Sequence, residues 1–408
     1  MTTLPPNHPP PGPGAEEILA LIRQRALPLP PEQVSLDQAG GRTLREPVCA
    51  PEDQPAFDRS AFDGFAIRLD DPSARFQVVD VIRAGQWCPR ELRHGEAVQI
   101  ATGGALPGPG LQVVMKEDTR RENEVVEVLR RESSRNIRFQ GEDARQGQVL
   151  VEAGTVLSPG ALALLASIGH TRPWVTRLPQ VSHVATGNEI IPPDEAPQPG
   201  RIRDSNSTLV RAFLRRWDIL PRQCRTPEEQ ARAKQAVQEQ FASAEPPDLL
   251  LISGGASVGE HDFTRGLLEE LGYTIHLARA NTRPGKPLIF ATRDRALAFG
   301  LPGNPLAHFV CLNLFVRAAL AGLSGANGPM ELLAGLLAGE LNEEPSPRET
   351  WWPAHVTFGP AGPAVALLRW RSSGDLTCLA RANALARVPP GYAWLAQGAA
   401  IQFIAIDT

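Results

Sequence analysis

DLLLISGG (248–255) is the stretch that decides the fold, because a run of apolar residues ends there in two glycines. A short apolar run bounded by turn residues is typical of a strand buried on both faces. VSHVATGNE (181–189) and LAFGLPGNP (297–305) repeat the pattern of a strand followed by a polar loop. Helical spacing lies between these strands, as in Val210, Phe213, Leu214 and Trp217. Strands that alternate with helices predict a doubly wound parallel sheet covered on both faces.

Outside this α/β region the pattern changes to short strands between turns. The predicted strands are FQVVDVI (76–82), EAVQIAT (96–102), LQVVMKE (111–117), EVVEVLR (124–130) and, near the end, AIQFIAI (400–406). Two helices, Glu16–Ala26 and one opening at Ser158-Pro159, are expected to pair and to form one domain from two separated pieces.

We therefore expect an α/β multidomain chain with five segments. These are a disordered proline-rich tail (1–14), a split helical and linker domain I (15–46 and 144–177), a β-rich domain II (47–143), a doubly wound, parallel-sheet α/β domain III (178–326) and a C-terminal β domain IV (327–408).

Composition excludes several classes of protein. The 408 residues contain 41 Lys plus Arg and 45 Asp plus Glu, and this net charge of -4 argues against nucleic-acid binding. No apolar run approaches the roughly 20 residues of a membrane span. The five cysteines are far apart, so neither a disulfide framework nor a thiolate metal site is expected. The sequence predicts a cytoplasmic protein.

The loops after the predicted parallel strands carry the residues that suggest chemistry. Ligands of such sheets bind outside the carboxyl ends of the strands. Glycines in the GGASVG loop (254–259) let backbone N–H groups approach an oxyanion, and RANTRPGKP (279–287) supplies positive charge. Carboxylates beside these groups make sense if Mg²⁺ bridges them to a phosphate; they are Glu189, Asp204 and Asp262. Together these residues suggest phosphoryl-bond chemistry on an anionic ligand.

Each feature also has a purely structural interpretation. Asp262 and Asn304-Pro305 are suited to helix N-termini, and a GGxSxG loop alone is a common turn. The arginines are equally suited to a solvated surface, and Phe62 and Phe65 are expected in a core. Convergence of several loops on one rim favours the functional interpretation.

Taken in order, eight segments resemble the molybdopterin molybdenumtransferase family, which includes bacterial MoeA and the gephyrin E domain. They are SAFDGFA, ATGGALPGPG, NIRFQGED, ATGNEI, GRIRDSN, SGGASVGEHDF, RPGKP and GLPGNP. The resemblance covers nearly the whole chain and implies that domain III (178–326) is molybdopterin-binding-like. It implies a homodimer whose active cleft is shared between subunits, and an enzyme that releases AMP from adenylylated molybdopterin and inserts molybdate with Mg²⁺ as cofactor.

The resemblance also implies roles for residues of this sequence. The catalytic residues would be Glu189, Asp262, Asp63 and Asp143, with Glu189 and Asp262 around the metal. The substrate-binding residues would be Thr102, Gly254, Gly255, Ser257, Gly259, Arg279, Arg283, Lys286, Pro302, Pro305 and Ser373. Partners would include the molybdopterin adenylyltransferase and maturation factors of apo-molybdoenzymes, and neither nucleic acid nor membrane.

The chain departs from the family pattern at several positions. Arg279 and Arg283 stand where lysines are common, Arg225 where an acidic residue is common, and Asn188 where the turn usually has an acid. A tyrosine hydroxyl is lost in SAFDGFA. These changes keep two alternatives open besides the transferase: a catalytically weakened, molybdopterin-binding carrier or scaffold, and an adenylyltransferase or nucleotide hydrolase of similar fold.

Overall fold

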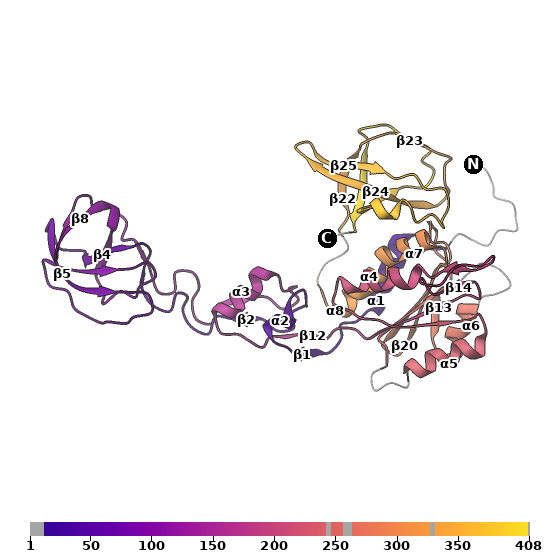
Figure 1. The fold of residues 1–408 in the computed structure, drawn as a ribbon, viewed down its shortest axis with the longest axis horizontal. Coiled ribbons are helices and arrows are strands. Elements are labelled where there is room, and N and C mark those ends of the chain that lie inside the picture. The colour runs from indigo at the N-terminus through magenta and orange to yellow at the C-terminus, as the bar shows by residue number, and fades with distance from the viewer. Residues whose placement is uncertain (1–11, 242–245, 256–262, 327–330, 407–408) are drawn as a thin grey trace. The chain divides into compact units, whose positions relative to one another are not determined.

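The computed structural model describes residues 12–241, 246–255, 263–326 and 331–406, which form two compact units (Figure 1). Unit 1 comprises the described residues up to Arg45, residues 154–157 and those from Trp174 onward. Unit 2 comprises residues 46–153 and 158–173. The finer division into domains I to IV stays a prediction.

The centre of unit 1 is a six-stranded sheet with the strand order β16-β13-β17-β21-β20-β18. The bounds are β13 (Val181–Thr186), β16 (Arg222–Thr226), β17 (Leu249–Ser253), β18 (Thr274–Leu277), β20 (Ile289–Arg293) and β21 (Ala296–Leu301). The first four strands in this order are parallel, which confirms the predicted sheet. The last two add an antiparallel edge that the sequence analysis did not anticipate. Every residue of β13 and β17 is buried, as a sheet covered on both faces requires.

Helices cover this sheet on its two faces. They are α4 (Asn206–Arg215), α5 (Gln230–Phe241), α6 (Phe263–Glu270), and the continuous helix of α7 (Pro305–Cys311), the π-helical turn η2 (Leu312–Val316) and α8 (Arg317–Ser324). The N-terminal helix α1 (Ala15–Arg25) lies beside α8 (Figure 1). α1 belongs to unit 1 and the helix after Ser158 belongs to unit 2, and their predicted pairing stays a prediction. Gly322 of α8 lets Ala26, at the end of α1, come close: a Cβ on Gly322 would lie 2.6 Å from the Ala26 Cβ.

The helix Pro305–Ser324 is long and apolar enough, by length and composition alone, to cross a membrane. The sequence analysis overlooked this stretch when it found no such run. Within the structure, however, 78% of its most apolar window is buried among other residues of the protein. Burial of that kind is typical of a core helix.

The C-terminal part of unit 1 is a second six-stranded sheet. Its strands are β19 (Thr282–Arg283), β22 (Leu333–Leu337), β24 (Glu349–Gly359), β25 (Gly362–Leu367), β26 (Ala384–Val388) and β28 (Ala400–Ala405). The order is β19-β24-β25-β22-β28-β26, and a further pairing of β24 with β26 closes five of these strands on themselves. Because β19 pairs with β24, the RPGKP segment is joined to this sheet. The predicted strand at the C-terminal end is confirmed as β28.

Shorter elements complete unit 1. They are β1 (Pro31–Gln33), α2 (Leu36–Ala39), β12 (Trp174–Thr176), β14 (Ile190–Ile191), β15 (Ile202–Arg203), β23 (Leu341–Asn342), η3 (Leu379–Arg381) and β27 (Trp394–Leu395). The parallel pair β14 and β15 matters for the site, because it brings the GNE turn beside the RIRDSN segment.

Unit 2 contains a third six-stranded sheet, ordered β7-β4-β6-β5-β9-β8. Its strands are β4 (Gly64–Arg68), β5 (Arg75–Ile82), β6 (Glu96–Ile100), β7 (Leu111–Met115), β8 (Thr119–Glu122) and β9 (Val125–Val128). The other elements are β2 (Val48–Cys49), β3 (Arg59–Ser60), η1 (Lys116–Asp118), β10 (Ile137–Arg138), β11 (Val149–Val151) and α3 (Pro159–Ser167). All four strands predicted for this region are confirmed.

One core expectation in unit 2 was wrong. Phe65 is buried, as predicted, because it lies on β4 with its side chain in the core. Phe62 precedes that strand, in the turn after β3, and its side chain is 47% exposed.

Candidate functional site

The loops at the carboxyl ends of β13, β17 and β21 border an open pocket of about 850 Å³ in unit 1. The parallel register explains why they meet, since Thr186, Ser253 and Leu301 end adjacent strands. The predicted site residues that line this pocket are Glu189, Gly254, Gly255, Arg283, Lys286, Pro302, Pro305 and Ser373. The structure therefore brings together residues that lie up to 184 positions apart (373 − 189 = 184).

Backbone geometry in this pocket depends on glycine. Gly254 has φ of +95°, and a Cβ on it would lie 2.5 Å from the carbonyl oxygen of Thr186. Gly255 also has positive φ, +61°. The Thr264 hydroxyl donates to the Gly254 carbonyl (2.9 Å) and ties the loop to α6. The rest of this loop, with Ser257, Gly259, His261 and Asp262, lies outside the described residues.

Five basic side chains among the described residues line the pocket. Its basic lining residues are Arg203, Arg283, Lys286, Arg348 and Arg371. The Arg283 guanidinium lies over the Trp370 ring, 5.2 Å from its centroid, and Arg348 Nη1 donates to the Thr282 carbonyl (3.1 Å). Burial, with a contribution from Arg283, lowers the pKa of the Arg348 guanidinium. Such a cluster of guanidinium and ammonium groups favours a polyanionic ligand.

Arg348, Trp370 and Arg371 were missed by the sequence analysis. Arg348 directly precedes β24, and Trp370 and Arg371 follow β25, and the only signal near them was the RSSGDL stretch that contains Ser373. Arg279, by contrast, was predicted for the site but does not line the pocket. It is half-buried, and its carbonyl lies close to Gly12.

The carboxylates of the pocket differ in their surroundings. Glu189 is exposed and lines the pocket, in the turn that Gly187 begins. Asp204 is 3% exposed; its Oδ1 accepts the Ser207 N–H (2.9 Å) and its Oδ2 accepts Arg225 Nε (2.8 Å). Burial opposes ionisation of Asp204, but the hydrogen bonds from Ser207 and the charge of Arg225 outweigh it and lower its pKa. Arg225, one of the departures from the family pattern, is thus an internal counter-charge.

Hydrogen bonds fix the proline loop Pro302–Pro305 between two parts of unit 1. Asn206 Nδ2 donates to the Gly303 carbonyl (2.8 Å), and Asn304 Nδ2 donates to the Ser373 hydroxyl (2.8 Å). Asn304 does precede α7, but its side chain bonds Ser373 instead of capping the helix. The loop therefore positions Ser373 at the pocket.

The remaining predicted residues lie in unit 2. Asp63 Oδ1 accepts both the backbone N–H (2.7 Å) and the hydroxyl (2.9 Å) of Thr102, and these bonds lower the pKa of Asp63. Both side chains are exposed. Asp143 forms an ion pair with Arg138 and is also exposed. The structure thus brings Asp63 and Thr102 together and places Asp143 on another loop.

The residues that the structure describes do not by themselves form a metal site. No group of three or more His, Cys, Asp or Glu side chains with metal-ligand spacing occurs in the parts of the chain that the structure describes. Asp204 is committed to Ser207 and Arg225, which leaves Glu189 and Glu228 as the carboxylates of the pocket with exposed side chains.

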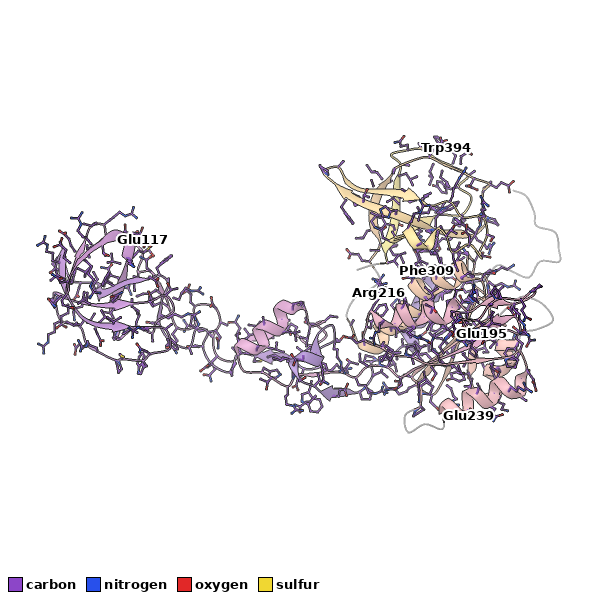
Figure 2. All side chains as sticks on the ribbon, in the orientation of Figure 1. Glu117, Glu195, Arg216, Glu239, Phe309 and Trp394 are labelled. Atoms are coloured by element: carbon purple, nitrogen blue, oxygen red, sulfur yellow. The ribbon has the colours of Figure 1, made fainter. Side chains whose placement is uncertain are left out.

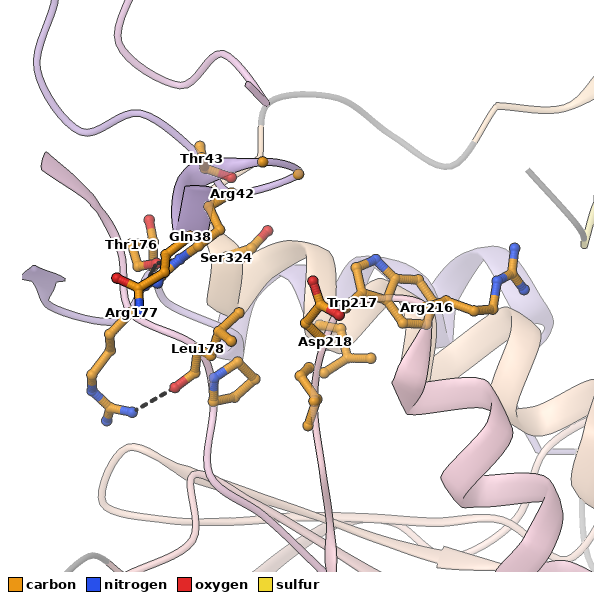
Figure 3. A pocket seen from close by; sticks show the side chains of 15 residues that line it. Gln38, Arg42, Thr43, Thr176, Arg177, Leu178, Arg216, Trp217, Asp218 and Ser324 are labelled. Carbon is orange, nitrogen blue, oxygen red and sulfur yellow. Dashed lines mark hydrogen bonds between the residues drawn. The ribbon is translucent and has the colours of Figure 1, made fainter. Parts of the chain in front are cut away.

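A second pocket, of about 110 Å³, lies between the 38–43 segment and the end of α4 (Figure 3). Its arginines are engaged within the protein: Arg42 donates to the Thr176 carbonyl, and Arg177 donates to the Leu178 carbonyl and to Asp248. Trp217 and Leu178 are among its apolar lining residues. Its small volume, below the ~300 Å³ typical of ligand pockets, makes the larger pocket the candidate site.

A doubly wound α/β unit with a cation-rich pocket at the carboxyl ends of its parallel strands is the class of protein suited to an anionic ligand. Two known domain families match successive parts of the chain. Residues 14–169 match the MoeA N-terminal region (domain I and II), and residues 182–322 match a probable molybdopterin binding domain.

Relatives that align with nearly the full length of the chain identify its family. The molybdopterin molybdenumtransferase of Staphylococcus aureus is 30% identical over 98% of this chain and 96% of its own length. That of Staphylococcus epidermidis is 30% identical over 88% of this chain and 87% of its own. The crystal structure of the molybdopterin biosynthesis moeA protein from Pyrococcus horikoshii has a TM-score of 0.80 and 25% identity, covering 96% of this chain and 99% of that one. The chain belongs to the molybdopterin molybdenumtransferase family, and its role is in molybdenum cofactor biosynthesis.

Proposed function

We propose that the protein is a molybdopterin molybdenumtransferase, which inserts molybdate into adenylylated molybdopterin and releases AMP. The observation that carries the proposal is the pocket in which Arg283, Lys286 and Arg348 face the same space as Glu189. A tetrahedral oxyanion and a phosphoanhydride both need such cations, and cleavage of the anhydride needs a carboxylate to orient or deprotonate the attacking group.

The chain's own residues act on the substrate by charge and position. Arg283 lies over the Trp370 ring, and Arg348 is held by the Thr282 carbonyl, so both guanidinium groups are positioned before the ligand arrives. Gly254 and Gly255 line the pocket without a side chain in the way; the Gly254 N–H donates to the Leu301 carbonyl (3.2 Å), so Gly255 is the proposed backbone donor to the ligand. Ser373, fixed by Asn304, adds a hydroxyl.

Mg²⁺ is part of this proposal. Glu189 is its proposed ligand among the described residues, and Asp262, in the loop after Gly255, is the second. When bound, the ion would supply Lewis-acid stabilisation of charge on the phosphoryl oxygens. We also propose that the protein is a cytoplasmic homodimer that receives its substrate from the adenylyltransferase and passes the product to maturation factors.

The test is AMP release by the purified protein from adenylylated molybdopterin, with molybdate and Mg²⁺ added or withheld. Release that depends on both supports the proposal. Tight binding of the substrate without turnover would refute it and would favour the carrier or scaffold function instead.

A further inference from the structure

A pocket in unit 2 has no role in the chemistry described above. It measures about 420 Å³ and is lined by Phe57, Gly85, Gln86, Trp87, Gly103 and Ala105. The volume falls within the ~300–1,000 Å³ range of small-molecule sites. None of the six lining residues carries a charge. The pocket is therefore suited to an uncharged part of a ligand and not to a phosphate or an oxyanion.

Two aromatic side chains in this pocket are open to solvent. Trp87 is 63% exposed and Phe57 is 47% exposed. Large aromatic groups that line one concave site and remain uncovered offer ring faces on which a planar heterocycle stacks.

The rest of the pocket leaves room for such a ring. Gly85 and Gly103 have positive φ, +83° and +76°, and a Cβ on either would meet nothing within 4 Å. Gln86 Oε1 accepts the Arg83 N–H (3.1 Å), so its amide nitrogen remains to donate to a ring nitrogen or carbonyl. The pocket thus combines stacking faces, open space and one directional donor.

The pocket also adjoins the Asp63–Thr102 pair. Gly103 follows Thr102 directly, and its N–H donates to the Ser60 carbonyl (2.8 Å), which holds the loop beside the segment that carries Asp63. A ligand whose ring occupied this pocket would have its attached chain near that pair.

We propose that this pocket binds a planar aromatic heterocycle of the substrate by stacking against Trp87 and Phe57. The proposal rests on the proposed function, because adenylylated molybdopterin carries two such rings, a pterin and an adenine. Both present a π face and acceptor atoms at the edge, which is the chemistry that the pocket recognises.

The test measures binding of two probes, AMP and unsubstituted pterin, to the full-length protein by titration calorimetry. In Trp87→Ala and in Phe57→Ala we expect the affinity for at least one probe to fall about fivefold or more, the lower end of what one stack contributes. Loss for AMP assigns the pocket to adenine, and loss for pterin assigns it to the pterin.

Two variants serve as matched controls. Trp87→Phe keeps a ring and should keep affinity within about threefold, since a phenyl ring still stacks. Trp394→Ala removes another exposed tryptophan, 59% exposed on β27 of unit 1, and should change neither affinity (Figure 2). All three replaced side chains are exposed, so the melting temperature should not move by more than about 2 °C.

Unchanged affinity for both probes in Trp87→Ala and Phe57→Ala would overturn the proposal, as would a Trp87→Phe variant as weak as Trp87→Ala. The same holds if the unaltered protein binds neither probe. Molybdate-dependent AMP release by the unaltered protein, together with normal binding by the variants, would refute the ring site and leave the proposed function intact.

Discussion

The ion pair between Arg225 and Asp204 should stabilise unit 1 more than any exposed ion pair of the same length. Its Nε–Oδ2 distance is 2.8 Å, and the carboxylate side is almost fully buried, whereas the arginine side chain is 41% exposed. Arg225→Met would leave Asp204 with its hydrogen bonds from Ser207 and without a counter-charge. Losing one partner of a buried pair costs ~3–5 kcal/mol, and solvent screening at the arginine reduces this to about 1–2 kcal/mol.

The matched control is Arg232→Met. Arg232 and Glu229 form a pair at 2.9 Å in the same unit, but both side chains are more than half exposed. We expect this variant to lose no more than about 0.5 kcal/mol. The assay is urea denaturation at pH 7, in which the difference in the free energy of unfolding between each variant and the unaltered protein is compared.

The pH dependence gives a second check with a definite sign. The pKa of Asp204 is lowered in the folded protein, so its contribution is present above the unfolded value of about 3.9 and is lost as pH falls through the folded pKa. The difference in the free energy of unfolding between Arg225→Met and the unaltered protein should therefore become smaller as the pH falls below about 4. Two outcomes would refute the reasoning. One is an equal loss of unfolding free energy in Arg225→Met and Arg232→Met at pH 7, and the other is a loss in Arg225→Met that stays the same below about pH 4.

Three further outcomes are expected. Glu189→Gln should abolish AMP release without a change in melting temperature, because the side chain is exposed and the carboxylate is what the reaction needs. Trp370→Leu should weaken molybdate binding about two- to fivefold, since a cation–π contact with Arg283 contributes ~0.5–1 kcal/mol, and Trp370→Phe should restore most of it in calorimetric titrations. Gly254→Ala should lower the free energy of unfolding by about 1–3 kcal/mol in urea, because φ is +95° and the Cβ meets the Thr186 carbonyl.

Each of these three predictions can be contradicted by a specific result. Turnover by Glu189→Gln at the normal rate would remove that residue from the chemistry, with Glu195→Gln as the exposed control. If Trp370→Leu binds molybdate as tightly as the unaltered protein, the cation–π contact between Trp370 and Arg283 does not contribute to binding. For Gly254→Ala the control is Gly200→Ala, whose φ is also positive but whose Cβ would meet nothing within 4 Å. Equal losses in both would mean that the close approach to Thr186 costs nothing.

The local sequence pattern was sufficient to predict where the strands lie and which loops follow them. The apolar runs that became β13, β17 and β21 are buried on both faces, and alternation or β-branched content marked β5, β6, β7 and β9 in unit 2. Parallel order then placed Glu189, Gly254 and Pro302 at one edge. These predictions succeeded because the tendency of a segment to form a buried strand is set by residues close in the sequence, and parallel strands bring the loops after them to one edge of the sheet.

The sequence by itself therefore determined the α/β framework, the family and the part of the pocket formed by the RPGKP segment and the loops after β13, β17 and β21. Tertiary structure added Arg348, Trp370 and Arg371, whose segments flank strands of the C-terminal sheet that the pairing of β19 with β24 joins to the RPGKP segment. It also decided that Arg225 would neutralise Asp204 and that Arg279 would lie away from the pocket. Such contacts join residues tens of positions apart, and no local periodicity specifies which distant side chains pack together.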